Sequence, residues 1–310
     1  MKQGQPWRGA LLLLLLGGVA AAVQGAPCQP LPLQPLAPGL WLVPAVAEDS
    51  DAVNRGRSSH LLLARDGGRV WAVGAGATPV LGARLRCTAQ QRLGQVVDDL
   101  IVPWAHAELA LGVRGLAPRR VWAAGGVAEA MAEQCAGCSD RLRQRLGDAA
   151  SDLGEQPVRL PTHRLMDDSF RLGPFDGYVL PRAEGRVVTV LRHRASGVMT
   201  AHGLLWGDGP PDLRDGDLAL VALSLQHLPQ LGRGATRWVG ESGALLDADG
   251  VAAQAAYVRA LQQAAQQAQE RGELDTPPPP LRWADHPRHA LNWQRAWRQA
   301  EDAWLRSAPR

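Results

Sequence analysis

Aromatic residues other than tryptophan are scarce in this 310-residue chain, which has two Tyr and two Phe against 11 Trp. Lysine is scarcer still, because Lys2 is the only lysine among 33 basic residues, and we interpret this skew as compositional since it follows no local pattern. The 34 Gly and 23 Pro stay below the share of a low-complexity chain, and the 46% hydrophobic and 20% charged residues are typical of a globular protein. Disorder is therefore excluded for most of the chain, whose length can bury a full core.

Long apolar runs are also missing, and the longest, residues 10–22, is too short to span a bilayer comfortably. It follows Lys2 and Arg8 and precedes small residues at 23–26, which is the layout of a secretory signal peptide. We therefore predict a signal over residues 1–25 and a soluble mature chain that is periplasmic or secreted, with no membrane span. Pro27 before Cys28 argues against lipoprotein cleavage there.

The mature chain has no excess charge of either sign. Without Lys2 and Arg8, 31 basic residues stand against 30 acidic ones. A nucleic-acid partner is not expected, because its electrostatic footprint is a strongly basic surface.

The four cysteines include one Cys-x-x-Cys pair, Cys135 and Cys138, and no second such pair. A zinc knuckle needs a second ligand pair, and a redox pair would follow a strand, whereas this pair lies within a predicted helix at 127–146. In an oxidising compartment four cysteines allow three pairings. We favour a local Cys135–Cys138 disulfide, which leaves Cys28 and Cys87 for the other bridge.

Strand-like runs alternate with turns in both halves, and helices follow them. Predicted strands cover 40–46, 59–64, 69–73, 158–160, 178–180, 187–192, 198–202 and 236–239, and predicted helices cover 78–93, 127–146, 217–228 and 251–271. This order predicts an α+β fold of four layers, αββα, over residues 26–272.

Residues 273–310 are predicted to form a Pro-rich spacer and a last helix. Trp293, Trp297, Ala300 and Trp304 recur at helical spacing on one face of it. We expect this stripe to pack on the chain's own domain, with partner docking as the alternative.

A segment at 102–112, Val-Pro-Trp-Ala-His-Ala-Glu-Leu-Ala-Leu-Gly, resembles the His-x-His-x-Asp-His-x-x-Gly motif of the metallo-β-lactamase fold. In that motif the side chains converge on two zinc ions that activate a water. Trp104 stands at the first His and Leu109 at the last, while His106 is retained and Glu108 stands at the Asp position.

Other landmarks of that fold fall in the same order, and most of them are substituted. Where the resemblance expects zinc ligands or ligand-region residues, this chain has Gly74, Ala124, Arg182, Arg186, Gly203 and Glu241, with His202 one residue before the bridging position. Within this fold, the chain most specifically resembles the exported quinoprotein relay system zinc metallohydrolases. The resemblance rests on the Cys-x-x-Cys helix, the stretch 204–217 and the tail 289–296. Members of that group are linked with quinoprotein dehydrogenase systems.

Through this resemblance, His106, Glu108 and Glu241 are the remaining candidate metal ligands. Apolar bulk at Trp104 and Leu109, and cations at Arg182 and Arg186, disfavour a bound dication, so we predict no dinuclear zinc site and no cofactor. The alternative is a mononuclear site for zinc or another divalent metal, in which Glu108, Glu241 and His202 would suit a harder ion such as manganese or calcium. Strand alternation counts against it, because it points His202 away from the pocket.

Other catalytic motifs are missing. No Gly-x-Ser-x-Gly elbow surrounds Ser59 or Ser242, and Gly74–Gly76 and 232–234 lack the strand-to-helix phosphate signature. We predict a catalytically degenerate protein that acts as a binding or accessory component. Its cleft would hold Trp104, His106, Glu108, Arg182, Arg186, His202 and Glu241, and its partner would be a small anionic molecule or a periplasmic protein. The alternative is a metal-dependent hydrolase.

Overall fold

The computed structural model describes residues 28–273 and 276–307, and its strands form two sheets. The first sheet has the order β1 to β7, with bounds Gln34–Ala37, Leu40–Val43, Leu61–Asp66, Arg69–Val73, Val97–Ile101, Arg120–Ala124 and His163–Leu165. The second has the order β12-β11-β10-β9-β8, and these strands are, from β8 to β12, Ser169–Leu172, Phe175–Ala183, Arg186–His193, Met199–Thr200 and Trp238–Val239. The predicted signal peptide lies outside the described residues.

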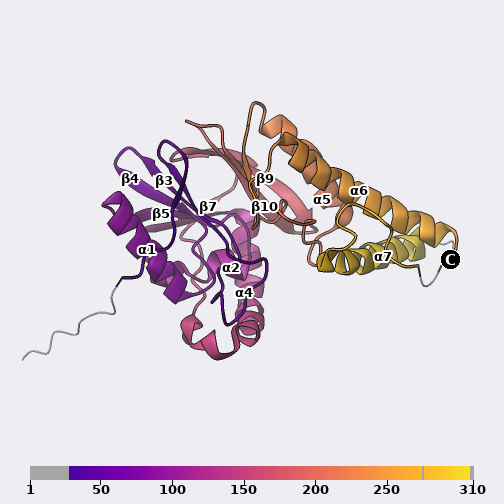
Figure 1. Cartoon of the computed structure of the whole chain (residues 1–310), viewed down its shortest axis with the longest axis horizontal. Helices are drawn as coiled ribbons and strands as arrows, with labels where there is room; N and C mark the ends of the chain where they lie inside the picture. The colour runs from indigo at the N-terminus through magenta and orange to yellow at the C-terminus, as the bar shows by residue number, and fades with distance from the viewer. Residues whose placement is uncertain (1–27, 274–275, 308–310) are drawn as a thin grey trace, which may run out of the picture.

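The two sheets lie face to face between helices (Figure 1). The helices are α1 Pro79–Leu93, α2 Ala107–Ala110, α3 Val113–Leu116, α4 Gly125–Leu146, α5 Leu218–Leu231, α6 Ala248–Glu270 and α7 Pro287–Ser307. Helix α1 covers the outer side of the first sheet, and α5 and α6 cover that of the second. The predicted α+β fold with αββα layers is confirmed.

Strand alternation builds the two sides of the first sheet. In β3, Leu61 and Leu63 belong to the apolar cluster that contains Leu85 of α1. Their neighbour Leu62 belongs to a second cluster, which joins residues of both sheets, including Phe175 of β9. Successive residues of a strand face opposite ways, so one buried strand supplies both the helix-facing and the sheet-facing core.

Side-chain caps fix the starts of three helices. Thr78, Asp217 and Asp247 each accept a hydrogen bond from a backbone N–H in the first turn of α1, α5 and α6. The predicted strand at 158–160 is wrong, since those residues have no regular structure and the strand begins at His163. No helix among the described residues is long and apolar enough to cross a membrane.

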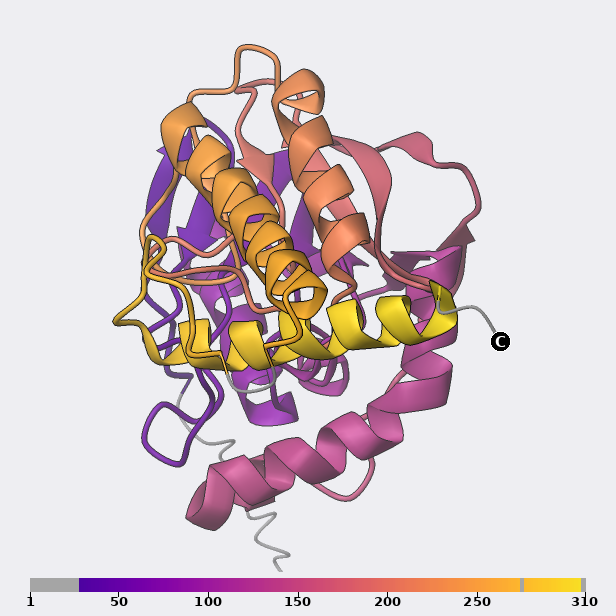
Figure 2. The same ribbon diagram turned by 90° about the vertical axis from the view of Figure 1, so that its right-hand side faces the viewer.

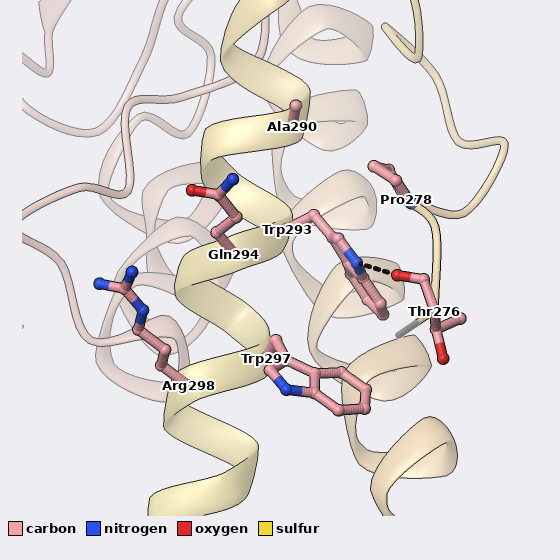
Figure 3. Close-up of a pocket in the computed structure, with 7 residues that line it drawn as sticks. All are labelled: Thr276, Pro278, Ala290, Trp293, Gln294, Trp297 and Arg298. Atoms are coloured by element: carbon pink, nitrogen blue, oxygen red, sulfur yellow. Dashed lines mark hydrogen bonds between the residues drawn. The ribbon is translucent and has the colours of Figure 1, made fainter. Parts of the chain in front are cut away.

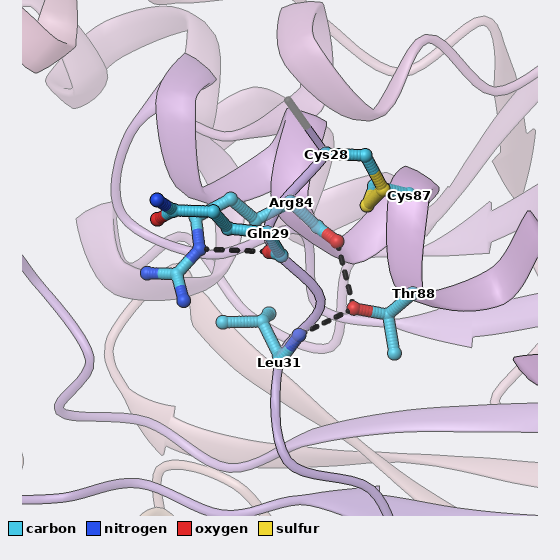
Figure 4. Close-up of a disulfide and its surroundings, with 6 residues drawn as sticks. All are labelled: Cys28, Gln29, Leu31, Arg84, Cys87 and Thr88. Atoms are coloured by element: carbon cyan, nitrogen blue, oxygen red, sulfur yellow. Dashed lines mark hydrogen bonds between the residues drawn. A yellow bond between two sulfur atoms is a disulfide. The ribbon is translucent and has the colours of Figure 1, made fainter. Parts of the chain in front are cut away.

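A disulfide joins Cys28 to Cys87 of α1 (Figure 4), as predicted. Beside it, Leu31 N–H donates to Thr88 Oγ1 at 2.7 Å, and Arg84 Nε donates to the Gln29 carbonyl, so the leading segment is tied along α1. The second predicted bridge is wrong: Cys135 and Cys138 are free thiols on α4. Both are buried in a continuous helix, where a small apolar side chain packs well without a bridge.

Helix α7 packs against α6 and crosses it (Figure 2). The side chain of Asn292 is fully buried and bonds Leu213 N–H and the Pro211 carbonyl, while His289 Nδ1 lies 2.9 Å from the Tyr257 hydroxyl. Trp293 is buried, whereas Trp304, at the end of the predicted stripe, is 54% exposed. The tail therefore packs on the chain's own domain through most of its stripe, and polar side chains hold it there.

Candidate binding cleft

A cleft of about 810 Å³ opens where the loop after β5, helix α4 and the β9–β10 hairpin meet. Five of the seven predicted cleft residues line it: Trp104, His106, Glu108, Arg182 and Arg186. The wall is completed by Cys138, Arg141 and Arg145 of α4 and by Asp212, Arg214 and Asp215.

Glu241 lies behind this wall rather than on it, buried at 3% exposure after β12. One carboxylate oxygen accepts from Trp104 Nε1 at 3.1 Å and from Gly203 N–H at 3.0 Å, and the other accepts from the Ser59 hydroxyl. Three protein donors thus satisfy this buried carboxylate, as buried charge requires.

Glu108, at the start of α2, is also buried and held by protein groups. Its Oε1 accepts from Ser50 Oγ at 2.9 Å and lies 3.0 Å from Arg145, and its Oε2 lies 3.1 Å from His106 Nδ1. Burial alone would raise the pKa of Glu108, but His106, Arg145 and the Ser50 hydroxyl outweigh it and lower that pKa. Glu108 is therefore an anion at neutral pH.

His106 joins the two carboxylates. Its Nδ1 also lies 3.7 Å from Glu241 Oε1, so the three predicted metal ligands do converge. Its ring stacks on Trp104, with centroids 4.3 Å apart and planes 6° apart.

Arg182 is the buried cation of the cleft, at 3% exposure near the end of β9. Its guanidinium lies over the Trp104 ring, 4.7 Å from the centroid, and one Nη donates to the Asp212 carbonyl at 2.7 Å. Its Nε and other Nη are buried without a partner among the described residues, and burial lowers its pKa. Since an arginine stays protonated, two donors of this buried cation have no hydrogen-bond partner among the described residues.

The other arginines of the cleft differ in whether a carboxylate neutralises them. Arg145 pairs with Glu108 and Arg214 with Asp212, at 2.6 Å for the latter. Among the described residues no carboxylate lies within ion-pair distance of Arg182, Arg186 or Arg141. The cleft lining holds five arginines and four carboxylates, the latter being Glu108, Glu133, Asp212 and Asp215, which is an excess of one cation beside the Trp104 ring.

His202 does not line the cleft, which corrects its place among the predicted cleft residues. It is fully buried behind β11, where Nδ1 meets Thr200 Oγ1 at 2.7 Å and Nε2 meets the His60 carbonyl at 2.9 Å. Both ring nitrogens are thus used between the sheets. His202 lies beyond the end of β11, so strand alternation does not apply to it.

A second hollow, of about 390 Å³, lies between α7 and the Pro-rich segment (Figure 3). Trp293 and Trp297 form its floor, Trp293 Nε1 donates to the Thr276 carbonyl, and Arg298 is the one charged residue of its lining. It brings no buried charge or acid–base pair together, so the cleft is the better candidate site.

Solved structures of similar shape decide the fold. A metallo-β-lactamase, FIM-1, from Pseudomonas aeruginosa in its mono-zinc form has a TM-score of 0.59 at 14% identity, with 75% of this chain and 96% of that chain covered. A metallo-β-lactamase from Pontibacter korlensis has 0.57 at 15%, covering 74% and 99%, and one from Hirschia baltica has 0.57 at 10%, covering 74% and 98%. This chain has the metallo-β-lactamase fold. No family model and no curated protein sequence matches it.

The residues present do not fit the two zinc ions of the metallo-β-lactamase motif. A Cβ added to Gly203, at the bridging Asp position, would lie 3.1 Å from the Trp104 ring, and one on Gly74 would lie 2.6 Å from Leu109. Apolar side chains thus fill the room beside two positions at which the resembled motifs would have ligands. Among the residues described, no group of three or more His, Cys, Asp or Glu is arranged to hold a metal ion.

Sequence reasoning missed the donors that hold the two carboxylates. Ser50, Ser59 and Arg145 come from segments far along the chain from Glu108 or Glu241, and nothing in their local sequence marks them. The substitution at Gly203 did carry a signal, because a glycine at an expected ligand position often marks a close approach of another group.

Proposed function

We propose that this chain is an exported protein whose metallo-β-lactamase fold binds a small anion and no longer supports metal-dependent hydrolysis. It would act as an accessory component of a quinoprotein dehydrogenase system in the periplasm. The observation that carries the proposal is Arg182, a buried cation with two unpartnered donors beside an aromatic ring.

The chemistry of this corner favours a carboxylate attached to an apolar body. Arg182 belongs to the cleft lining, and a carboxylate that displaces the groups covering its two unpartnered donors would form charge-assisted hydrogen bonds with them. Trp104 lies directly beneath and offers an apolar surface, and Arg186 adds a second cation in the same lining. An aromatic carboxylate satisfies all three groups.

The proposed loss of metal-dependent hydrolysis is supported by the hydrogen bonds that occupy the carboxylates of Glu108 and Glu241. The oxygens of Glu241 and one oxygen of Glu108 already accept hydrogen bonds from protein donors, and Arg145 brings positive charge to Glu108. A divalent ion would have to displace these donors and sit beside a guanidinium, which Coulomb repulsion disfavours.

The periplasmic setting is supported by three features. The leader has the layout of a signal peptide, the Cys28–Cys87 disulfide suits an oxidising compartment, and the tail resembles the quinoprotein relay group. A periplasmic protein partner that inserts an acidic loop into the cleft would use the same chemistry.

Calorimetry of residues 26–310 with benzoate and benzene-1,3-dicarboxylate tests the proposal. We expect binding of both, tighter for the dicarboxylate, and a weakening of about tenfold or more in Arg182→Gln, since a hydrogen bond to a charged group contributes about 1.5–3 kcal/mol. Arg171→Gln is the matched control, because Arg171 is 80% exposed on β8. Absence of binding, or equal binding by wild type and Arg182→Gln, would overturn it.

The second candidate function is a metal-dependent hydrolase with an atypical mononuclear site, and the convergence of His106 with Glu108 and Glu241 favours it. Zinc or another divalent ion would then be the cofactor. A bound ion that is lost in His106→Ala together with an ester or lactam hydrolysis activity would support this function and contradict the first.

A further inference from the structure

Two free thiols lie one turn apart on α4, the helix that forms one wall of the cleft. Cys138 belongs to the cleft lining and is 8% exposed, while Cys135 is fully buried in the main apolar cluster. The two sulfurs therefore differ in access: a molecule in the cleft can reach Cys138 and cannot reach Cys135.

The spacing of the pair allows a bond between them. Residues three apart on an α-helix lie on one face with Cα atoms about 5 Å apart. A disulfide accepts Cα separations of about 4.4–6.8 Å. The free pair can therefore close into a disulfide with local adjustment of α4.

The surroundings place the negative charge on the sulfur that faces the cleft. The Cys135 thiol, Arg141 and His106 together lower the pKa of Cys138 to about 6, although burial and Glu108 act to raise it. The hydrogen bond with Cys138, followed by burial, raises the pKa of Cys135. Arg141 lies on the same helix with one Nη 3.5 Å from Cys138 Sγ. This charge distribution is typical of an attacking thiolate and its resolving partner.

Core packing alone would explain the buried Cys135, but it does not explain a second thiol, Cys138, that lines the cleft beside Arg141. A thiol that only fills space needs no opening to a cleft and no guanidinium beside its sulfur. The chain also keeps its structural disulfide elsewhere, between Cys28 and Cys87. We propose that Cys138 and Cys135 form a thiol–disulfide exchange site that accepts small disulfides bearing carboxylates, which Arg141 and Arg186 hold in the cleft.

The reaction takes two steps. The Cys138 thiolate attacks one sulfur of the small disulfide, forms a mixed disulfide, and releases the other half as a thiolate. That thiolate takes the proton of Cys135, which then attacks Cys138 Sγ and releases the second half as a thiolate. The Cys pair is oxidised by two electrons, and the small disulfide is reduced to one thiol and one thiolate.

Glutathione disulfide is the probe that tests this inference, with products read by mass spectrometry of the native protein and by peptide mapping. In the wild type we expect a Cys135–Cys138 disulfide and release of glutathione. In Cys135→Ala we expect a stable glutathione adduct on Cys138, and in Cys138→Ala no adduct on Cys135. A folded wild type that leaves both thiols free, or labelling of Cys135 and Cys138 alike, overturns the inference.

The role of Arg141 gives a second readout. Arg141→Met is expected to slow adduct formation in the Cys135→Ala background severalfold at pH 6, because thiolate content and anion capture both fall. Arg164→Met is the matched control, since Arg164 is exposed on β7. Equal rates in the two variants would remove Arg141 from the site. This test needs no benzoate binding, so its failure and that of the proposed function are distinguishable.

Discussion

The Trp104 ring lies against Gly203 so closely that a Cβ on Gly203 would sit 3.1 Å from two ring atoms. The ring cannot move aside easily, because Glu241 accepts from its Nε1 and Arg182 lies over its face. Trp104 and Gly203 thus pack closely against one another.

Substitution at Gly203 tests this packing. Gly203 has a φ of 77°, so Gly203→Ala carries a backbone cost of about 1–2 kcal/mol in addition to the contact with Trp104. Gly234→Ala is the matched control, because Gly234 has a φ of 80° and open space around its Cα. We expect urea denaturation to show that Gly203→Ala lowers the free energy of unfolding by about 1 kcal/mol more than the control does.

The coupling between the two positions is the decisive part of that comparison. In a Trp104→Leu background the extra cost of Gly203→Ala should shrink, because the ring is gone. An unchanged difference in the double variant would mean that the extra cost comes from Val188, whose Cγ1 would lie 3.0 Å from the added Cβ, and not from Trp104.

Glu241 is predicted to stabilise the fold as a buried acceptor. Glu241→Gln turns one acceptor oxygen into a donor, which then faces Ser59 or the Trp104 and Gly203 donors, so we expect a loss of about 1–3 kcal/mol in the free energy of unfolding. Glu184→Gln, at an exposed position in the β9–β10 turn, should have little effect. If both variants unfold at the same urea concentration, the carboxylate is not an integral part of the structure.

The sequence predicted those features of the structure that depend on neighbouring residues, and it failed for features that depend on contacts between distant segments. The spacing of apolar residues marked most strands and helices, because it depends on near neighbours. Whether Cys135 and Cys138 form a disulfide could not be decided from nearby residues, because their spacing suits a disulfide, a redox pair or core packing. The predicted bridge between them was wrong.

The predictions for the candidate site likewise succeeded for positions along the chain and failed for contacts between distant segments. Trp104 and Arg182 could be placed in the cleft from their positions along the resembled motifs, whereas their contact across the cleft required the fold. His202 and Glu241 were assigned to the cleft from their positions along the resembled motifs, yet neither lines it, and each forms hydrogen bonds with buried protein groups instead.

Acid should destabilise the fold through His60. Burial, opposed by its hydrogen bond to Gly243, lowers the pKa of His60 from 6.5 to about 4, and its neutral ring accepts from Ala45 N–H and donates to the Gly243 carbonyl. Between those two pH values the unfolded chain binds more protons at this ring, so stability is full above about pH 6.5 and falls as pH drops towards 4. The expected loss from His60 is about 3 kcal/mol.

The pH dependence of unfolding in urea measures this loss. His60→Asn should reduce the slope between pH 7 and 4 without abolishing it, because burial also lowers the pKa of His202. His227→Asn, at an exposed position on α5, should leave the slope as it is. A slope in His60→Asn equal to that of wild type would show that His60 does not carry the acid sensitivity.

Metal content tests the central claim most directly, that packed apolar and paired side chains have replaced the zinc site of this fold. The protein, made with its leader and without a histidine tag, is purified from cells grown with added zinc and measured by elemental analysis after dialysis. We predict well below one zinc ion per chain. About two tightly held ions per chain, the complement of a dinuclear hydrolase, would contradict the account.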